Sequence, residues 1–139
     1  MGDDVGDDVA EAAGGETALP RLLRAMAPTR DATTAWTFCA CGARVPDGLD
    51  AIGTFREAEG WTAIAPVTRA VALGVPHDGT FARLTLAVHS SLHAVGFLAR
   101  VATALAARGI ACNAVSAFHH DHLFVPAGRA EEAMAVLEG

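Results

Sequence analysis

The sequence predicts an α+β fold in which two related halves share a mostly antiparallel β-sheet, with helices on one face of that sheet. Two observations predict this class. Strand-like runs come in pairs joined by short polar tips, which is typical of antiparallel hairpins, and a helix-like run follows each pair. The two halves also repeat one order of features: a strand, a tip, a second strand, a proline and a helix.

The repeat is visible when AIGTFREAEGWTAIAPVTRA is placed above AVSAFHHDHLFVPAGRA. The matched positions are Phe55 with Phe118, Pro66 with Pro126, and Arg69-Ala70 with Arg129-Ala130. The segment between the phenylalanine and the proline is shorter in the second copy, as expected where a hairpin tip varies in length. We therefore divide the chain into a disordered acidic tail (1–15), a first half (16–76) and a second half (77–139).

The first half begins with a helix that Thr17 can cap and Pro28 ends. Its apolar face consists of Leu19, Leu22, Leu23 and Met26. TAWTFCACG, rich in threonine and aromatic residues, predicts a strand, and Pro46-Asp47-Gly48 marks the turn that follows. AIGTF and WTAIAP then predict a hairpin, and VTRAVALG predicts a short helix that ends at Gly74.

The second half opens with the strand FARLTLAVH, whose core-facing residues are Leu84, Leu86 and Val88. Ser90 or Ser91 is expected to cap the long helix LHAVGFLARVATALAARG, with Gly109 as its left-handed C-terminal cap. The apolar stripe of this helix is predicted to be Val95, Leu98, Val101, Ala102 and Leu105. IACNAVSAF and HLFVP predict strands joined by HHD, and GRAEEAMAVLE predicts the last helix.

Composition excludes several classes of protein. The 139 residues are 52% hydrophobic and 19% charged, so the chain can bury a core. The net charge is −6 and lysine is absent, which argues against binding nucleic acid or anionic lipid. No apolar run approaches the roughly 20 residues of a membrane span, and the acidic N-terminus lacks the features of a secretory signal. Three cysteines without framework spacing predict reduced thiols and a cytoplasmic location.

Over LHAVGFLARVATALAARGIACNAVSAF the sequence resembles the ACT domain family, small regulatory modules of ferredoxin-like βαββαβ order that bind amino acids or similar ligands. The resembling features are a strand, a turn, Gly96 near the helix start, a long helix, and a strand directly after Gly109-Ile110. The likeness is closest to bacterial tandem ACT-like proteins of uncharacterised function and covers roughly residues 17–138. The turn HSSLHAVG lacks the Asp-x-Pro-Gly-like pattern of many amino-acid-binding members.

The turn and first helical turn at 89–96 are the candidate ligand site. A helix N-terminus offers free N–H groups and a partial positive charge, which suit the carboxylate of an amino acid. An ammonium group needs an acceptor, for which Asn113 and Asp121 are candidates. A capped helix without any ligand accounts for the same residues equally well. The full expected set is Ser90, Ser91, Leu92, Val95, Gly96, Asn113, His120, Asp121 and His122.

FHHDHLFVP places three histidines and an aspartate within four positions. His120 and His122 would share a strand face and could bind Zn²⁺, but no third ligand and no zinc signature accompany them. We favour a hairpin tip in which Asp121 makes the turn and no metal is bound. In a ligand groove, Asp121 would hold the ammonium and the histidines would make binding sensitive to pH.

Two other constellations have simpler structural explanations. Cys39 and Cys41 lie two apart on a predicted strand, which favours buried, inert thiols over a metal pair with distant histidines. The serines at 90 and 91 lie beside His89 and His93 and could form a nucleophile with its base. A helix cap explains these serines better, because no Gly-x-Ser-x-Gly elbow is present.

The sequence therefore predicts a non-catalytic regulatory module that binds an amino acid or a related metabolite and needs no cofactor. The first alternative is a ligand-free dimerisation or partner-docking module, and the second is a metal- or histidine-assisted hydrolase. Two halves this small leave open sheet edges, which favours a homodimer. No nucleic-acid or membrane partner is expected.

Overall fold

The computed structural model describes residues 26–31, 33–87, 92–93 and 95–139. The expected tail at 1–15 and all but the end of the helix expected at 17–26 lie outside these residues, as do Val88, Ser90 and Ser91. Pro28 was expected to end that helix. In the structure it begins a three-residue strand that the sequence analysis missed.

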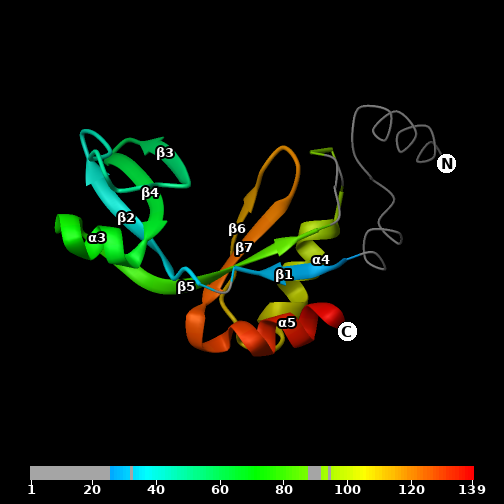
Figure 1. Ribbon diagram of the computed structural model, residues 1–139. Helices are drawn as coiled ribbons and strands as arrows, with labels where there is room; N and C mark the ends of the chain where they lie inside the picture. The colour runs from blue at the N-terminus through cyan, green and yellow to red at the C-terminus, as the bar shows by residue number, and fades with distance from the viewer. Residues whose placement is uncertain (1–25, 32, 88–91, 94) are drawn as a thin grey trace.

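The described residues form one antiparallel sheet with three helices and a 3-10 turn (Figure 1). The strands are β1 (Pro28–Arg30), β2 (Trp36–Gly42), β3 (Gly53–Glu57), β4 (Gly60–Pro66), β5 (His77–Leu86), β6 (Asn113–Ser116) and β7 (Asp121–Pro126). The helices are α3 (Val67–Leu73), α4 (Phe97–Ala106) and α5 (Ala130–Glu138), and the 3-10 turn η1 is Ala127–Arg129. None of the helices in the described ranges has the length and apolarity that a membrane crossing requires.

Strand β5 belongs to both halves of the sheet. Its first part pairs with β2, with Trp36 opposite Phe81, and its second part pairs with β7 on one edge and with β1 on the other. The strand orders are β3-β4-β2-β5 in the first half and β1-β5-β7-β6 in the second. Both are the order of a ferredoxin-like unit, so the predicted α+β class is confirmed. In the first half, the connection at 43–52 holds no helix where the second half has α4.

The helices cover one face of the sheet. Strand residues of β5 and β7 that point to this face pack against α4 and α5 in the larger core: Ala82, Leu84, Leu86, Leu123 and Val125. A smaller core places Cys39, Ala63 and Ala65 against Ala70 of α3. Because side chains alternate along a strand, the residues between these core positions point to the opposite face, which we call the open face.

Aromatic side chains gather on the open face. Trp36, Ile64 and Phe124 form a third buried cluster, and Phe38 lies edge-on to both Phe81 and Phe124, with ring centroids 5.3 and 5.7 Å apart. Phe124 is only 1% exposed, although no described helix packs on this face. The cluster joins the two halves, because its members come from β2, β4 and β7, and strands β2 and β5 lie between the β3–β4 and β6–β7 hairpins (Figure 1).

The repeat is present in three dimensions. Pro66 and Pro126 hold the same extended conformation directly before α3 and η1, and Ala70 and Ala130 are both buried. Arg69 donates to the Gly48 carbonyl at 2.8 Å, 21 residues back, and Arg129 donates to the Arg108 carbonyl at 2.9 Å, also 21 residues back. The match of Phe55 with Phe118 is wrong, because Phe55 lies within β3 whereas Phe118 lies in the connection after β6.

The start of α4 corrects several expectations. Gly96 is the N-cap of this helix rather than part of its first turns, and its φ of 88° explains the glycine without a ligand. The cap expected at Ser90 or Ser91 is therefore wrong. The buried stripe is Phe97, Val101 and Leu105, four residues apart. Two residues of the predicted stripe do not belong to it. Val95 precedes the helix and is 84% exposed, and Ala102, which follows buried Val101, is also exposed.

Candidate functional site

A cavity of about 130 Å³ lies on the open face where the two halves meet. We call it the seam cavity. Its walls are Ile52, Gly53 and Ile64 from the first half, and Arg83, Val115, Ala117, His122 and Phe124 from the second. Six of these eight residues are apolar or glycine, so the cavity has apolar walls and two polar side chains. That composition is typical of small-molecule sites.

The sheet register places the two polar side chains. Arg83 lies opposite Phe124, and Thr85 lies opposite His122 two pairs along the β5–β7 ladder, on the same face of the sheet. Val115 of β6 pairs with His122 from the other edge. Because directly paired residues point to the same face, all five side chains belong to the open face.

Two side chains hold Arg83 in place: Asp31, which directly follows β1, and Trp36, the first residue of β2. Its Nη2 donates to Asp31 Oδ2 at 3.1 Å, and the indole Nε1 of Trp36 donates to the same oxygen at 3.1 Å. The guanidinium carbon lies 5.2 Å from the centroid of the Trp36 ring, in cation–π range. Arg83 Nε is buried and finds no hydrogen-bond acceptor among the described residues. A pre-positioned guanidinium with a spare donor is suited to binding a carboxylate.

His122 is the second polar side chain of the cavity. Its Nδ1 lies 3.0 Å from Thr85 Oγ1. Burial lowers the pKa of His122, and the positive charges of Arg83 and His120 lower it further, against a smaller opposing effect of Asp121. The ring is therefore neutral near pH 7. When the Thr85 hydroxyl donates to Nδ1, the proton sits on Nε2 and offers a second donor.

Of the residues expected at the ligand site, the structure describes all but Ser90 and Ser91. Leu92 and Val95 are 61% and 84% exposed. Asn113 lies opposite Phe124, three residues along β6 from the Ser116–Asp121 pair at the tip. Asp121 and His122 point to opposite faces of β7, and Asp121 is only 7% exposed. Of the expected residues that the structure describes, His122 alone lines the seam cavity.

The segment FHHDHLFVP does form a hairpin tip. The connection runs over 117–120 and is closed by a hydrogen bond from the Ala117 N–H to the His120 carbonyl at 3.0 Å. Asp121 does not make the turn, because it is the first residue of β7 and pairs with Ser116. Within the described ranges, no three His, Cys, Asp or Glu side chains are grouped as metal ligands.

The cysteines are buried or half-buried thiols. Cys39 is 2% exposed, and burial, followed by the neighbouring Cys41, raises its pKa. Burial also raises the pKa of Cys41 and of Cys112. A thiol with a raised pKa stays protonated and reacts slowly. Cys39 is buried as predicted, whereas Cys41 is only half-buried.

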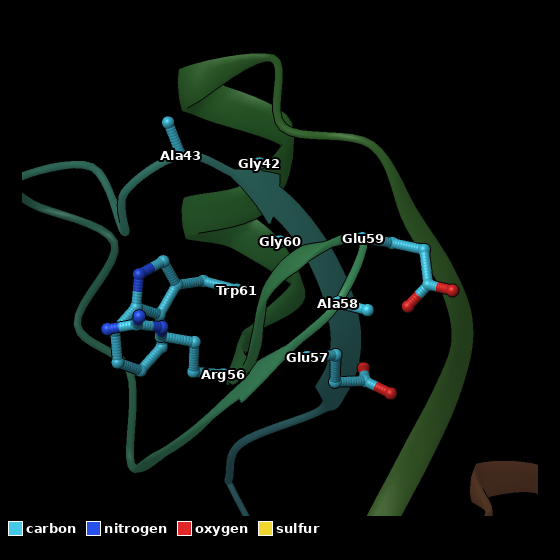
Figure 2. A pocket seen from close by; sticks show the side chains of 8 residues that line it. All are labelled: Gly42, Ala43, Arg56, Glu57, Ala58, Glu59, Gly60 and Trp61. Carbon is cyan, nitrogen blue, oxygen red and sulfur yellow. The ribbon is translucent and has the colours of Figure 1, made fainter.

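A second concavity, of about 510 Å³, lies at the tip of the β3–β4 hairpin. Figure 2 shows Arg56 and Trp61 on one side of the hairpin and the carboxylates of Glu57 and Glu59 projecting on the other. The positive charge of Arg56 and the negative charges of Glu57 and Glu59 therefore do not face one common space in which a single ligand could contact both. Gly60 at its floor lies so close to Gly42 that an added Cβ would come 2.7 Å from the Gly42 carbonyl oxygen. We assign this concavity to close strand packing rather than to a site.

Comparison with known proteins agrees with this architecture of two joined ferredoxin-like units. One model of the ACT domain matches residues 14–82 and a second matches residues 82–139. The chain belongs to the ACT domain family and carries two such domains in tandem. ACT domains are ligand-binding regulatory modules, typically without catalytic activity. A search among curated proteins finds no match.

Several solved structures are similar to this chain. A protein of unknown function from Vibrio cholerae, described as a possible transport protein, is 37% identical, with 84% of this chain and 90% of that chain covered and a TM-score of 0.76. A protein from Agrobacterium tumefaciens is 20% identical, with 74% and 78% covered and a TM-score of 0.60. The ligand-free regulatory subunit of aspartate kinase from Thermus thermophilus is 12% identical, with 81% and 96% covered and a TM-score of 0.54. The last two show the fold alone.

Sequence reasoning missed most of the seam cavity. Arg83 was placed on the side of its strand opposite the Leu84 face, and a cavity on that side was not predicted. The available signal was aromatic: Phe81 lies on the same side of the strand as Arg83, and Phe124 directly follows core-facing Leu123. Bulky apolar residues on both sides of a strand indicate that both sides are covered.

Proposed function

We propose that the chain is a non-catalytic regulatory module that binds an amino acid or a related small metabolite, and that this ligand occupies the seam cavity. The supporting observation is that both halves contribute walls to one small cavity. A ligand there contacts β3 and β4 from one side and β5, β6 and β7 from the other. Its affinity therefore depends on how the halves are arranged, and binding shifts that arrangement in return, which is what regulation requires.

The cavity chemistry supports a carboxylate ligand. Arg83 offers a guanidinium that Asp31 and Trp36 already orient, so little side-chain entropy is lost on binding. Ile52, Ile64 and Phe124 offer apolar surface for the rest of the ligand. The Ser90–Gly96 turn with the histidine tip is the alternative position for the ligand. The experiments below distinguish the two.

The proposal includes a homodimer in the cytoplasm. All four residues of the edge strand β6 are exposed, and Val115 on β6 and Phe118 beside it are 39% and 66% exposed. Pairing this edge with a second copy would satisfy its free backbone groups and cover both side chains. Light scattering should give the mass of a dimer at micromolar concentration. A monomeric mass there would overturn this part of the proposal.

The function is tested by a thermal-shift screen of amino acids and their related carboxylic acids. A ligand at 100 times its Kd should raise the free energy of unfolding by about 2.7 kcal/mol. Arg83→Met should abolish the shift, whereas Arg100→Met, on an exposed position of α4, should keep it. The function is wrong if no compound stabilises the protein. The site is wrong if a stabilising compound acts equally on Arg83→Met.

A further inference from the structure

We infer that the seam cavity selects a short carboxylate anion without an ammonium group, such as the deaminated carbon skeleton of an amino acid. This rests on the proposed function and narrows its ligand class. Three features of the cavity support the inference. Its polar side chains are hydrogen-bond donors, its described lining residues include no acidic one, and it is small and mostly apolar.

The two polar side chains that line the cavity, Arg83 and His122, can both donate hydrogen bonds. Arg83 keeps a buried Nε–H without an acceptor among the described residues, although its Nη2 is already bonded to Asp31. His122 offers its Nε2–H when the Thr85 hydroxyl donates to Nδ1. An entering carboxylate supplies acceptors to both groups. A carboxylate in the cavity would pair with the Arg83 guanidinium through a charge-assisted hydrogen bond.

Among the described residues that line the cavity, none has an acidic side chain. Asp31, the carboxylate that is paired with Arg83, is not among the lining residues. Its Oδ2 already accepts hydrogen bonds from both Arg83 and Trp36. An ammonium in the cavity would lose water, gain no carboxylate partner and lie close to the Arg83 cation. The cavity therefore distinguishes a carboxylic acid from the corresponding amino acid by rejecting the second charge.

Cavity size limits the ligand to a few heavy atoms. About 130 Å³ is well below the 300–1,000 Å³ typical of drug-sized ligands. The apolar side chains that line the cavity can contact a short aliphatic chain: Ile52, Ile64, Val115 and Phe124. Each buried methylene should strengthen binding by about fourfold until the cavity is full.

Butanoate, 2-aminobutanoate and butylamine test the charge selection, because they share one four-carbon chain and differ only in their charged groups. We would measure their dissociation constants by NMR titration at pH 7.5 in a buffer free of carboxylates. Butanoate should bind more tightly than either amine-containing compound by about tenfold or more, the effect of one charge-assisted hydrogen bond or one desolvated charge.

Two variants locate the binding. Arg83→Met removes the guanidinium and should weaken butanoate binding by about tenfold or more. Gly53→Ala adds a methyl group at the cavity wall, 3.9 Å from Ile64 Cδ1, which is an ordinary contact that leaves the fold intact. It should weaken butanoate binding while the melting temperature is retained, so the test stands even if Arg83→Met is unstable.

The possible outcomes separate the inference from the proposed function. If 2-aminobutanoate binds as tightly as butanoate and both are lost in the variants, the charge selection is wrong but the seam cavity is the ligand site. If binding is unchanged in Gly53→Ala and Arg83→Met, the cavity is not the site and the inference fails. If none of the three compounds binds and the wider screen is also negative, both the inference and the proposed function fail.

Discussion

Arg83 and Asp31 are 52 residues apart in the sequence and form an ion pair of 3.1 Å across the edge of the sheet. The pair links β5 to the segment between β1 and β2, and both side chains are half-buried, with 29% and 24% of their surfaces exposed. Trp36 stabilises it by donating to the same carboxylate oxygen. The Arg83 side chain is therefore ordered before any ligand arrives, which lowers the entropy cost of binding.

Replacing Asp31 by asparagine should strengthen carboxylate binding. The change removes a negative charge near the bound anion but keeps an oxygen that can accept from Trp36. Relieving this repulsion should raise butanoate affinity about three- to tenfold. Stability should fall by less than about 1 kcal/mol, as for a partly exposed ion pair. NMR titration and urea denaturation measure the two effects, and an unchanged or weaker affinity would contradict the predicted repulsion between Asp31 and the bound carboxylate.

Phe124 should behave as a core residue although it lies on the open face. It is 1% exposed and packs with Trp36 and Ile64. Phe124→Ala should lower the free energy of unfolding by about 3–5 kcal/mol because it leaves a cavity among these side chains. Phe55→Ala is the matched control, since Phe55 is 72% exposed and should cost less than about 1 kcal/mol. Equal costs in urea denaturation would show that the open-face cluster is not packed as described.

Gly60→Ala and Gly53→Ala should differ sharply in stability. Gly60 has a φ of 131°, and an added Cβ would lie 2.7 Å from the backbone oxygen of Gly42. Gly53 has neither feature. We expect Gly60→Ala to cost about 1–3 kcal/mol and Gly53→Ala less than about 0.5 kcal/mol. Thermal unfolding measures both, and a stable Gly60→Ala protein would contradict the close approach of β4 to the end of β2.

His122 should make stability fall in mild acid. Burial, Arg83 and His120 hold the pKa of His122 below its ordinary value of 6.5, against the opposing effect of Asp121. The unfolded chain therefore binds a proton at a higher pH than the folded chain. The contribution of this neutral ring is complete above pH 6.5 and is lost as the pH falls through the lowered pKa.

The variant His122→Gln should flatten the stability profile below pH 6.5, whereas His119→Gln, at an exposed position of the tip, should not. Urea denaturation across this range measures the profile. An equal slope in wild type and His122→Gln would contradict the buried, neutral state of this histidine.

Most of the fold could be predicted from the sequence because it depends on local patterns. Leu84 and Leu86 alternate with polar residues, Gly74 and Gly109 occupy left-handed positions, and both prolines of the repeat stand before a helix or 3-10 turn. Strand β1 was not predicted because three residues are too few to show an alternating pattern of apolar and polar side chains. Its ladder with Leu84, Thr85 and Leu86 is entirely long-range.

The site could not be predicted in the same way. Ser90–Gly96 and the histidine tip were predicted as the ligand site because their polar residues are adjacent in the sequence. The seam cavity instead combines Ile52, Arg83 and His122, which only the shared strand β5 and the strand order bring together. His122 was singled out as part of a tip, yet its position opposite Thr85 is what places it in the cavity.

The most direct test of the central claim is the set of NOEs between bound butanoate and the protein in a methyl-labelled NMR sample. If the seam cavity is the ligand site, the butanoate methyl group should give NOEs to Ile52, Ile64 and Val115, and the Arg83 Nε–H resonance should shift on titration. NOEs confined to Leu92, Val95 and the tip at 117–120, with an unmoved Arg83 Nε–H resonance, would contradict the account and place the ligand at the N-terminus of α4.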